Sequence, residues 1–129
     1  GRRLMSGLCL ALGAAIAVLG ADMAELRWTH SVQKTEWRET WRATPAGLQL
    51  ELAAVQGSGA GMEPGDGATL ENGFWIWRPQ RPAQPELILT RSGYTGSDWQ
   101  ICIKGNCRAV GSYFPGSAPD QNMILKPCP

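Results

Sequence analysis

The residues best suited to chemistry lie in a short polar segment that holds the single histidine of the chain, His30. Lys34 follows four residues later, and hydroxyl groups stand at Ser31 and Thr35. An imidazole and an ammonium group with two hydroxyl donors nearby could bind an anionic small molecule. In the alternative interpretation, His30 is a hydrogen-bonded core residue, and Lys34 and Thr35 form the solvated tip of a hairpin.

The sequence contains few residues that could serve a catalytic or metal-binding function. Neighbouring residues of a strand point to opposite faces, so His30 and Ser31 cannot pair as a nucleophile and its base. A hydrolase would need a base and an oxyanion site arranged around Ser31, Ser58 or Thr35, and the chain has one histidine to offer. One histidine and a few oxidisable thiols also make a poor tetrahedral metal site. We therefore expect no catalytic residue, no metal and no cofactor.

A run of small residues at 57–61 offers a second candidate site. Glycines such as Gly59 and Gly61 permit unusual backbone conformations, and successive N–H groups in such a loop can surround an anion. A tight connection between strands would explain the same composition. The spacing matches neither of the common phosphate-binding glycine motifs. If this loop folds over the histidine segment, Glu63 would become a partner for the imidazole or the lysine.

Tryptophan supplies a third kind of chemistry, because six indole rings in 129 residues could stack on a ligand. Trp75 and Trp77 share one face of an expected strand. Clustered tryptophans in so small a chain can equally form its core. Arg38 and Arg42 share a face with a threonine between them, and we expect them to form a solvated stripe beside glutamates.

The first 21 residues indicate the compartment. Arg2 and Arg3 precede an uncharged apolar run over residues 4–21, which is the pattern of a secretory signal. If retained, the same run would be an apolar anchor helix, although spanning a bilayer takes about 20 residues. We expect residues 1–20 to be a signal peptide or membrane anchor, and residues 21–129 to form one domain in the periplasm or another extracytoplasmic space. Membrane contact is expected only through an uncleaved N-terminal segment.

Charge and composition narrow the fold and the partners. Removing two arginines from the 12 basic residues leaves one fewer than the 11 acidic residues, so no electrostatic case for nucleic acid binding remains. Sixteen glycines and nine prolines require many turns. Short segments that alternate apolar and polar residues predict about seven strands, at 26–32, 35–43, 48–52, 73–78, 86–91, 99–103 and 106–110.

These segments predict an all-β fold, either a small antiparallel sandwich or a barrel. The first two segments should pair as a hairpin. Residues 37–42 would also fit a short helix, but their aromatic and β-branched content favours a strand.

The cysteines predict one disulfide. A two-residue turn at Lys104 and Gly105 would place Cys102 opposite Cys107 at a non-hydrogen-bonded pair, where Cα atoms approach most closely. The closed loop is short, so the bond would stabilise the fold by about 2 kcal/mol on the chain-entropy model. With Cys9 assigned to the leader, Cys128 is left over, either free or in an intermolecular bridge.

Two unusual segments carry a resemblance to a known family, namely residues 30–35 (HSVQKT) and 57–64 (GSGAGMEP). Together with two tryptophans that follow the first segment and the cysteine hairpin, they resemble the bacterial family called domain of unknown function 1850 over residues 25–111. The resemblance implies an exported, mostly β protein, often encoded beside tripartite solute transporters of the TAXI type. It supplies no catalytic residues. Gln33 stands where an acidic residue is common in that family.

The sequence therefore predicts a small exported β domain that acts as a non-catalytic accessory or small-ligand-binding module of a TAXI-type transport system. Two alternatives remain open at this point. The chain could be a structural envelope protein that docks on another subunit through a tryptophan-rich face, or it could be a small hydrolase.

Overall fold

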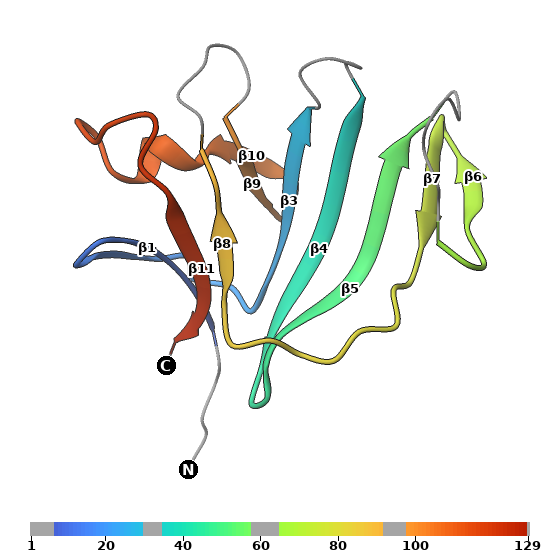
Figure 1. Cartoon of the computed structure of the whole chain (residues 1–129), viewed down its shortest axis with the longest axis horizontal. Coiled ribbons are helices and arrows are strands. Elements are labelled where there is room, and N and C mark those ends of the chain that lie inside the picture. Colours follow the sequence, from blue (N-terminus) through green and yellow to red (C-terminus); the bar gives the residue numbers. More distant parts are fainter. Residues whose placement is uncertain (1–6, 30–34, 58–64, 92–97, 129) are drawn as a thin grey trace.

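The computed structural model describes residues 7–29, 35–57, 65–91 and 98–128. These residues form eleven strands and one short 3-10 helix, Val110–Tyr113, with no α-helix among them. The strands make two antiparallel sheets that pack on each other and do not close into a barrel (Figure 1). The all-β prediction is confirmed, and the barrel alternative is wrong.

The larger sheet has seven strands in the order β10-β9-β3-β4-β5-β7-β6. Their bounds are β3 (Met23–Thr29), β4 (Glu36–Thr44), β5 (Gly47–Gln56), β6 (Thr69–Glu71), β7 (Phe74–Trp77), β9 (Gln100–Ile103) and β10 (Asn106–Ala109). The smaller sheet has the order β2-β1-β11-β8, with β1 (Gly7–Leu12), β2 (Ala15–Val18), β8 (Leu87–Leu89) and β11 (Met123–Cys128).

Each of the seven segments picked out by alternation holds a strand, and four further strands, β1, β2, β6 and β11, lie outside them. The predicted hairpin is confirmed, because β3 pairs with β4 along its whole length. Residues 37–42 are strand, as their composition favours.

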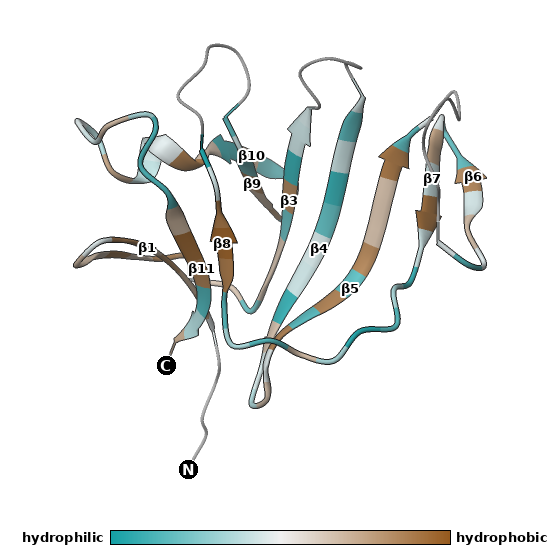
Figure 2. Ribbon diagram, viewed as in Figure 1, coloured by the Kyte–Doolittle hydropathy of each residue, from teal (hydrophilic) through white to brown (hydrophobic). Residues whose placement is uncertain are grey.

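The core lies between the two sheets. Leu8 and Leu10 from β1 and Leu125 from β11 pack there against Leu26 from β3 and Leu48 from β5, and all five are fully buried. Burying each such side chain is worth about 1.5–3 kcal/mol. In Figure 2, β5 and β8 are largely hydrophobic, whereas β4 is mostly hydrophilic. The core therefore depends on both sheets, including the strands nearest the N- and C-termini.

The N-terminal apolar segment is strand, which corrects the expected N-terminal apolar helix. β1 pairs with β11 on one side and with β2 on the other, and Gly13 at the intervening turn has a positive φ of 57°. A short, continuous apolar run suits a strand buried in a core as well as a helix, and periodicity alone cannot separate them. Among the described residues, none lies in a helix long and apolar enough to cross a membrane.

The cysteine hairpin forms as predicted. Cys102 and Cys107 are directly opposite each other on β9 and β10, bonded through sulfur, with Cα atoms 3.9 Å apart. Lys104 and Gly105 between the strands have φ values of 51° and 84°, and a two-residue type I′ turn requires positive φ at both positions.

Cys128 is not left over, which corrects the expectation for this residue. It is bonded to Cys9 with a Cα separation of 5.8 Å, because β1 and β11 are neighbours and Cys128 pairs with Gly7 in the register. All four cysteines of the chain are thus in disulfides. Two disulfides are compatible with an extracytoplasmic location.

Candidate binding site

Most of the predicted ligand-binding residues lie outside the described part of the chain: His30, Ser31, Lys34, Gly59, Gly61 and Glu63. Thr35 is described and directly precedes β4. The strand ends beside the two segments are close together, since the backbone N–H of Glu36 donates to the Oε1 atom of Gln56 across 3.2 Å. An anion site formed by these segments remains a prediction.

The described residues bring together a different group, on the inner face of the larger sheet. Trp28 lies directly opposite Trp37 in the register, Trp37 opposite Val55, and Val55 opposite Trp75. Directly opposite residues of neighbouring strands project from the same face of a sheet. This row therefore places three tryptophans on one face.

A second row lies one step along the same strands. Leu26 is opposite Glu39, Glu39 opposite Ala53, and Ala53 opposite Trp77. Leu26 belongs to the core, so both rows lie on the face that looks toward the smaller sheet. We call this surface the tryptophan face. Its members are Trp28, Trp37, Trp75, Trp77 and Glu39, together with Trp99, which contacts Trp28.

Three of the rings form a continuous aromatic cluster. Trp28 stacks on Trp37 with ring centroids 5.8 Å apart and an interplanar angle of 8°. The ring centroids of Trp28 and Trp99 are 4.6 Å apart, and these two rings are tilted by 47° relative to each other. Trp41 is only 2% exposed and belongs to the core, whereas Trp28, Trp37 and Trp99 are half-buried. Trp41 is thus a core residue, which is one of the two roles considered for the tryptophans. The cluster of Trp28, Trp37 and Trp99 is partly exposed, so a ligand can reach it.

Glu39 is the acidic member of the tryptophan face. Its carboxylate accepts a hydrogen bond from the indole Nε1 of Trp41 across 3.1 Å. Burial raises the pKa of Glu39 above its ordinary value of 4.5, while the Trp41 hydrogen bond and the charge of Arg81 act in the opposite direction. The carboxylate therefore lies in a poorly solvated place, where a charge is unfavourable without a partner.

The far end of the second row is fixed by a backbone contact. Gly65 lies so close to the indole ring of Trp77 that a Cβ atom on it would overlap the ring at Cδ1 and Nε1. Only glycine allows the chain to approach the ring this closely. The backbone at Gly65 thus covers part of Trp77.

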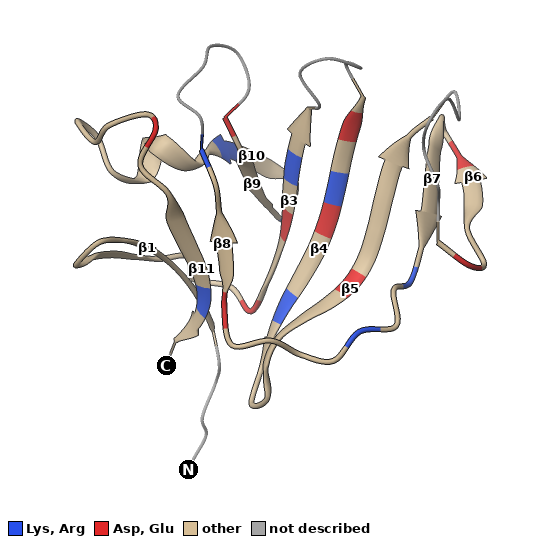
Figure 3. Ribbon diagram, in the orientation of Figure 1, with Lys and Arg blue, Asp and Glu red and all other residues tan. Residues whose placement is uncertain are grey.

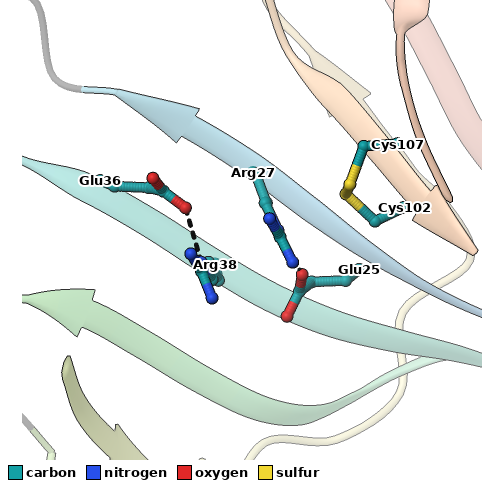
Figure 4. Close-up of a disulfide and its surroundings, with 6 residues drawn as sticks. All are labelled: Glu25, Arg27, Glu36, Arg38, Cys102 and Cys107. Atoms are coloured by element: carbon teal, nitrogen blue, oxygen red, sulfur yellow. Dashed lines mark hydrogen bonds and ion pairs between the residues drawn. A yellow bond between two sulfur atoms is a disulfide. The ribbon is translucent and has the colours of Figure 1, made fainter. Parts of the chain in front are cut away.

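The opposite face of the same strands is polar and charge-balanced. Charged residues gather along β3 and β4 (Figure 3). Arg27 and Arg38 stand opposite each other, and each pairs with a glutamate two residues earlier on its own strand. Figure 4 shows both pairs, with Glu25 near the hairpin disulfide and Glu36 farther from it. Arg42 pairs with a glutamate of β5 across 2.9 Å. This is the solvated stripe expected from the sequence, and its charges are already neutralised in pairs.

An ion pair between buried Arg91 and half-buried Asp98 supports the position of Trp99. Asp98 accepts two hydrogen bonds from Arg91, at Nε and Nη2, both 3.0 Å long, and a third at 3.0 Å from the backbone N–H of Trp99. The backbone N–H of Gly111 adds a fourth at 3.2 Å, and the indole N–H of Trp99 donates to the carbonyl of Thr90 at 2.9 Å. Trp99 is therefore held at both its backbone and its ring.

Sequence reasoning missed Glu39, Arg91 and Asp98. A signal for Glu39 was present, because strand alternation places it on the same face as Trp37 and Trp41. No comparable local signal marks Arg91 and Asp98, which meet across an intervening segment. Within the described ranges, no group of three or more His, Cys, Asp or Glu side chains could hold a metal ion.

Comparison with known proteins gives one match. The sequence model of a family described as "Domain of unknown function (DUF1850)" matches residues 24–110. These residues run from β3 to β10, so they contain every member of the tryptophan face and nearly all of the larger sheet, while β1, β2 and β11 lie outside the match. Neither a curated protein nor a solved structure matches the chain.

Proposed function

We propose that this chain, which belongs to the domain of unknown function (DUF1850) family, is an extracytoplasmic, non-catalytic accessory domain that binds a small ligand on its tryptophan face. Its two disulfides support a compartment where thiols are oxidised. The family resemblance supports a connection with TAXI-type solute transport, since such transporters are often encoded beside its members.

The observation that carries the ligand-binding proposal is the contact of Trp28 with Trp37 and Trp99. The three rings remain half-buried although the core beside them is fully buried. Ligand sites in proteins are rich in aromatic surface and add a few polar groups that fix orientation. Glu39, next but one to Trp37 on the same strand face, is such a group.

A thermal-shift screen of the full chain tests this function. The screen uses three classes of compound: small carboxylates with amino acids, neutral sugars, and amines. A ligand that binds the folded state raises its melting temperature by mass action. We expect at least one class to stabilise the wild-type protein and to lose that effect in Trp28→Leu.

The matched control is Phe74→Leu, which removes an aromatic ring from the polar face, where Arg38 lies 4.2 Å from the ring centroid. This variant should keep the ligand response. His30→Ala tests the predicted anion site separately, using the carboxylate hits. If no compound class shifts the melting temperature, or if Trp28→Leu responds like the wild type, ligand binding on the tryptophan face is disproved.

A second candidate function, protein docking, is favoured by the outer face of the smaller sheet. Ile16, Ala11, Ile124 and Ile88 are successive cross-strand partners in one row. Ile16 and Ile88 are 56% and 57% exposed, and the nearby Val18 is 73% exposed. Ala11 in the middle of the row is buried and Ile124 is half-buried, so the exposed apolar side chains lie on the two edge strands, β2 and β8. Exposed apolar patches are typical of protein–protein contact surfaces.

On this second candidate, the partner is the solute-binding component of the transporter. Size-exclusion chromatography of the two purified proteins should show a complex that Ile88→Lys abolishes, with Glu71→Lys on an exposed strand of the other sheet as the control. Separate elution of the wild-type proteins would exclude this partner.

A further inference from the structure

Among the residues that the structure describes, one side chain, Trp41, donates a hydrogen bond to the carboxylate of Glu39. Along β4 its neighbours on the same face are Trp37 and Trp41, and across the sheet they are Leu26 and Ala53. Trp41 donates to Oε1, and within the described part of the chain no hydrogen bond or ion pair reaches Oε2. A carboxylate can accept about four hydrogen bonds, so this one keeps most of its capacity unused.

Among the described residues, positive charge reaches Glu39 only from a distance. The four ion pairs among the described residues involve Arg27, Arg38, Arg42 and Arg91, and none includes Glu39. Arg81, an exposed residue, acts on it through its charge without an ion-pair contact. The other inner-face residues of β3, β5 and β7 described above are uncharged. A ligand group is thus free to be the close counter-charge.

The rings beside Glu39 favour the same sign of charge. Indole rings carry negative potential on their faces, and tryptophan binds organic cations more strongly than tyrosine or phenylalanine does. An anionic group here would meet both the carboxylate and the ring faces unfavourably. A neutral sugar could stack on the rings, but it would leave the negative charge of Glu39 without a partner.

We infer that the ligand of the tryptophan face carries an organic ammonium group, which binds to the carboxylate of Glu39 and to the ring face of Trp37, the tryptophan two residues before it on β4. This inference rests on the proposed ligand-binding function and names its substrate class. A protonated amine would donate hydrogen bonds to Oε2, and a quaternary ammonium group would bind through charge and ring contact alone.

The test uses choline and its neutral carbon isostere, in which a tert-butyl group replaces trimethylammonium. Both are titrated into the full chain while tryptophan fluorescence is recorded, because the binding rings report directly. We expect saturable quenching by choline and about tenfold weaker binding of the isostere. Equal binding of the two compounds would overturn the inference, since shape without charge would then suffice.

Glu39→Gln keeps the size of the side chain and its ability to accept from Trp41 but removes the charge. We expect this variant to bind choline about tenfold more weakly, while the isostere binds as before. Glu51→Gln, which removes a carboxylate from the charge-balanced face, should leave choline binding unchanged. A circular dichroism melt of each variant checks folding, and Trp37→Leu supplies a second, independent loss of binding should Glu39→Gln fail to fold.

The remaining outcomes separate this inference from the proposed function. If sugars or carboxylates bind in a Trp28-dependent way and choline does not, the face binds ligands but the ammonium assignment is wrong. If choline binds equally to wild type and Glu39→Gln, the carboxylate of Glu39 does not bind the ammonium group and that part of the inference is wrong. If none of the compounds binds, both the inference and the proposed function fall.

Discussion

Glu39 and Trp41 stand two residues apart on β4, and the buried indole N–H of Trp41 donates to the carboxylate of Glu39 across 3.1 Å. This hydrogen bond favours the charged carboxylate, but burial has the larger effect and raises the pKa of Glu39. The folded state therefore holds the proton of Glu39 more tightly than the unfolded state does.

The first prediction concerns stability and pH. Between the ordinary pKa of 4.5 and the raised folded-state pKa, the folded protein binds more protons than the unfolded chain, so stability falls as pH rises through this window. Glu39→Gln removes the unfavourable charge. The variant should be more stable than wild type near pH 7, and the difference should close as the pH falls to about 4.

Urea unfolding at both pH values measures this difference. Glu71→Gln, at an exposed position on β6, controls for the general effect of removing a negative charge. A Glu39→Gln variant less stable than wild type at neutral pH would contradict the assignment. A carboxylate that destabilises its own fold is the kind of residue kept for binding at the expense of stability.

The sequence predicted the structure correctly where a feature depends on the local residue pattern. Alternation located β5 and the β3–β4 hairpin, and turn chemistry at Lys104 and Gly105 predicted the Cys102–Cys107 bond. These features depend on residues close in sequence or on the period of a half-buried strand. The same reasoning placed Trp75 and Trp77 on one face.

Prediction failed where distant segments meet. The N-terminal apolar run reads equally as helix or buried strand, and only its pairing with β11 at the other end of the chain decides for strand. The Cys9–Cys128 bond depends on that pairing, as the Arg91–Asp98 contact depends on the packing of several segments. Assigning Cys9 to a removed leader also concealed the even count of four cysteines, which by itself suggests two bonds.

The second prediction compares the two disulfides. Cys9 and Cys128 are 119 residues apart in sequence, against 5 for Cys102 and Cys107. On the chain-entropy model the longer loop contributes about 5 kcal/mol and the shorter about 2 kcal/mol. Replacing both cysteines of a pair by serine should therefore lower the free energy of unfolding much more for the first pair. Urea titrations of the two double variants measure the difference, and equal losses would refute the ranking.

The third prediction concerns the ion pair between Arg91 and Asp98, the residue before Trp99. The side chain of Arg91 is only 4% exposed, and removing Asp98 would leave its guanidinium buried without a counter-charge. Breaking a buried pair from one side costs about 3–5 kcal/mol. Because the Asp98 side chain is 30% exposed and Arg91 also donates to the carbonyl of Gln121, Asp98→Ala should destabilise the protein by an amount toward the lower end of this range. It should also shift the fluorescence of Trp99, because Asp98 accepts from the backbone N–H of Trp99.

The control for this pair is Glu51→Ala, which breaks the exposed Arg42–Glu51 pair on the polar face. An exposed ion pair contributes about 0–1 kcal/mol. Similar losses for Asp98→Ala and Glu51→Ala in guanidinium titrations would mean that the Arg91 site is solvated in solution.

The fourth prediction asks whether the domain needs its N-terminal strands. Removing residues 1–20 takes away β1 and β2, and with them the fully buried side chains of Leu8 and Leu10. It also leaves Cys128 without a sulfur partner and exposes the paired edge of β11. Burial of the two leucines alone is worth about 3–6 kcal/mol. The 21–129 chain should therefore melt at a clearly lower temperature than the full chain and carry one reactive thiol.

Circular dichroism melts and thiol titration of the two chains, both refolded under oxidising conditions, measure this. The N-terminal residue of the protein isolated from cells, read by mass spectrometry, tests the predicted cleavage at the same time. If the isolated chain starts near residue 21 and melts like the full chain, the smaller sheet does not depend on β1, and the contribution of the Cys9–Cys128 bond to the native fold is disproved. If the isolated protein retains β1, the apolar segment serves as a structural strand of the folded domain.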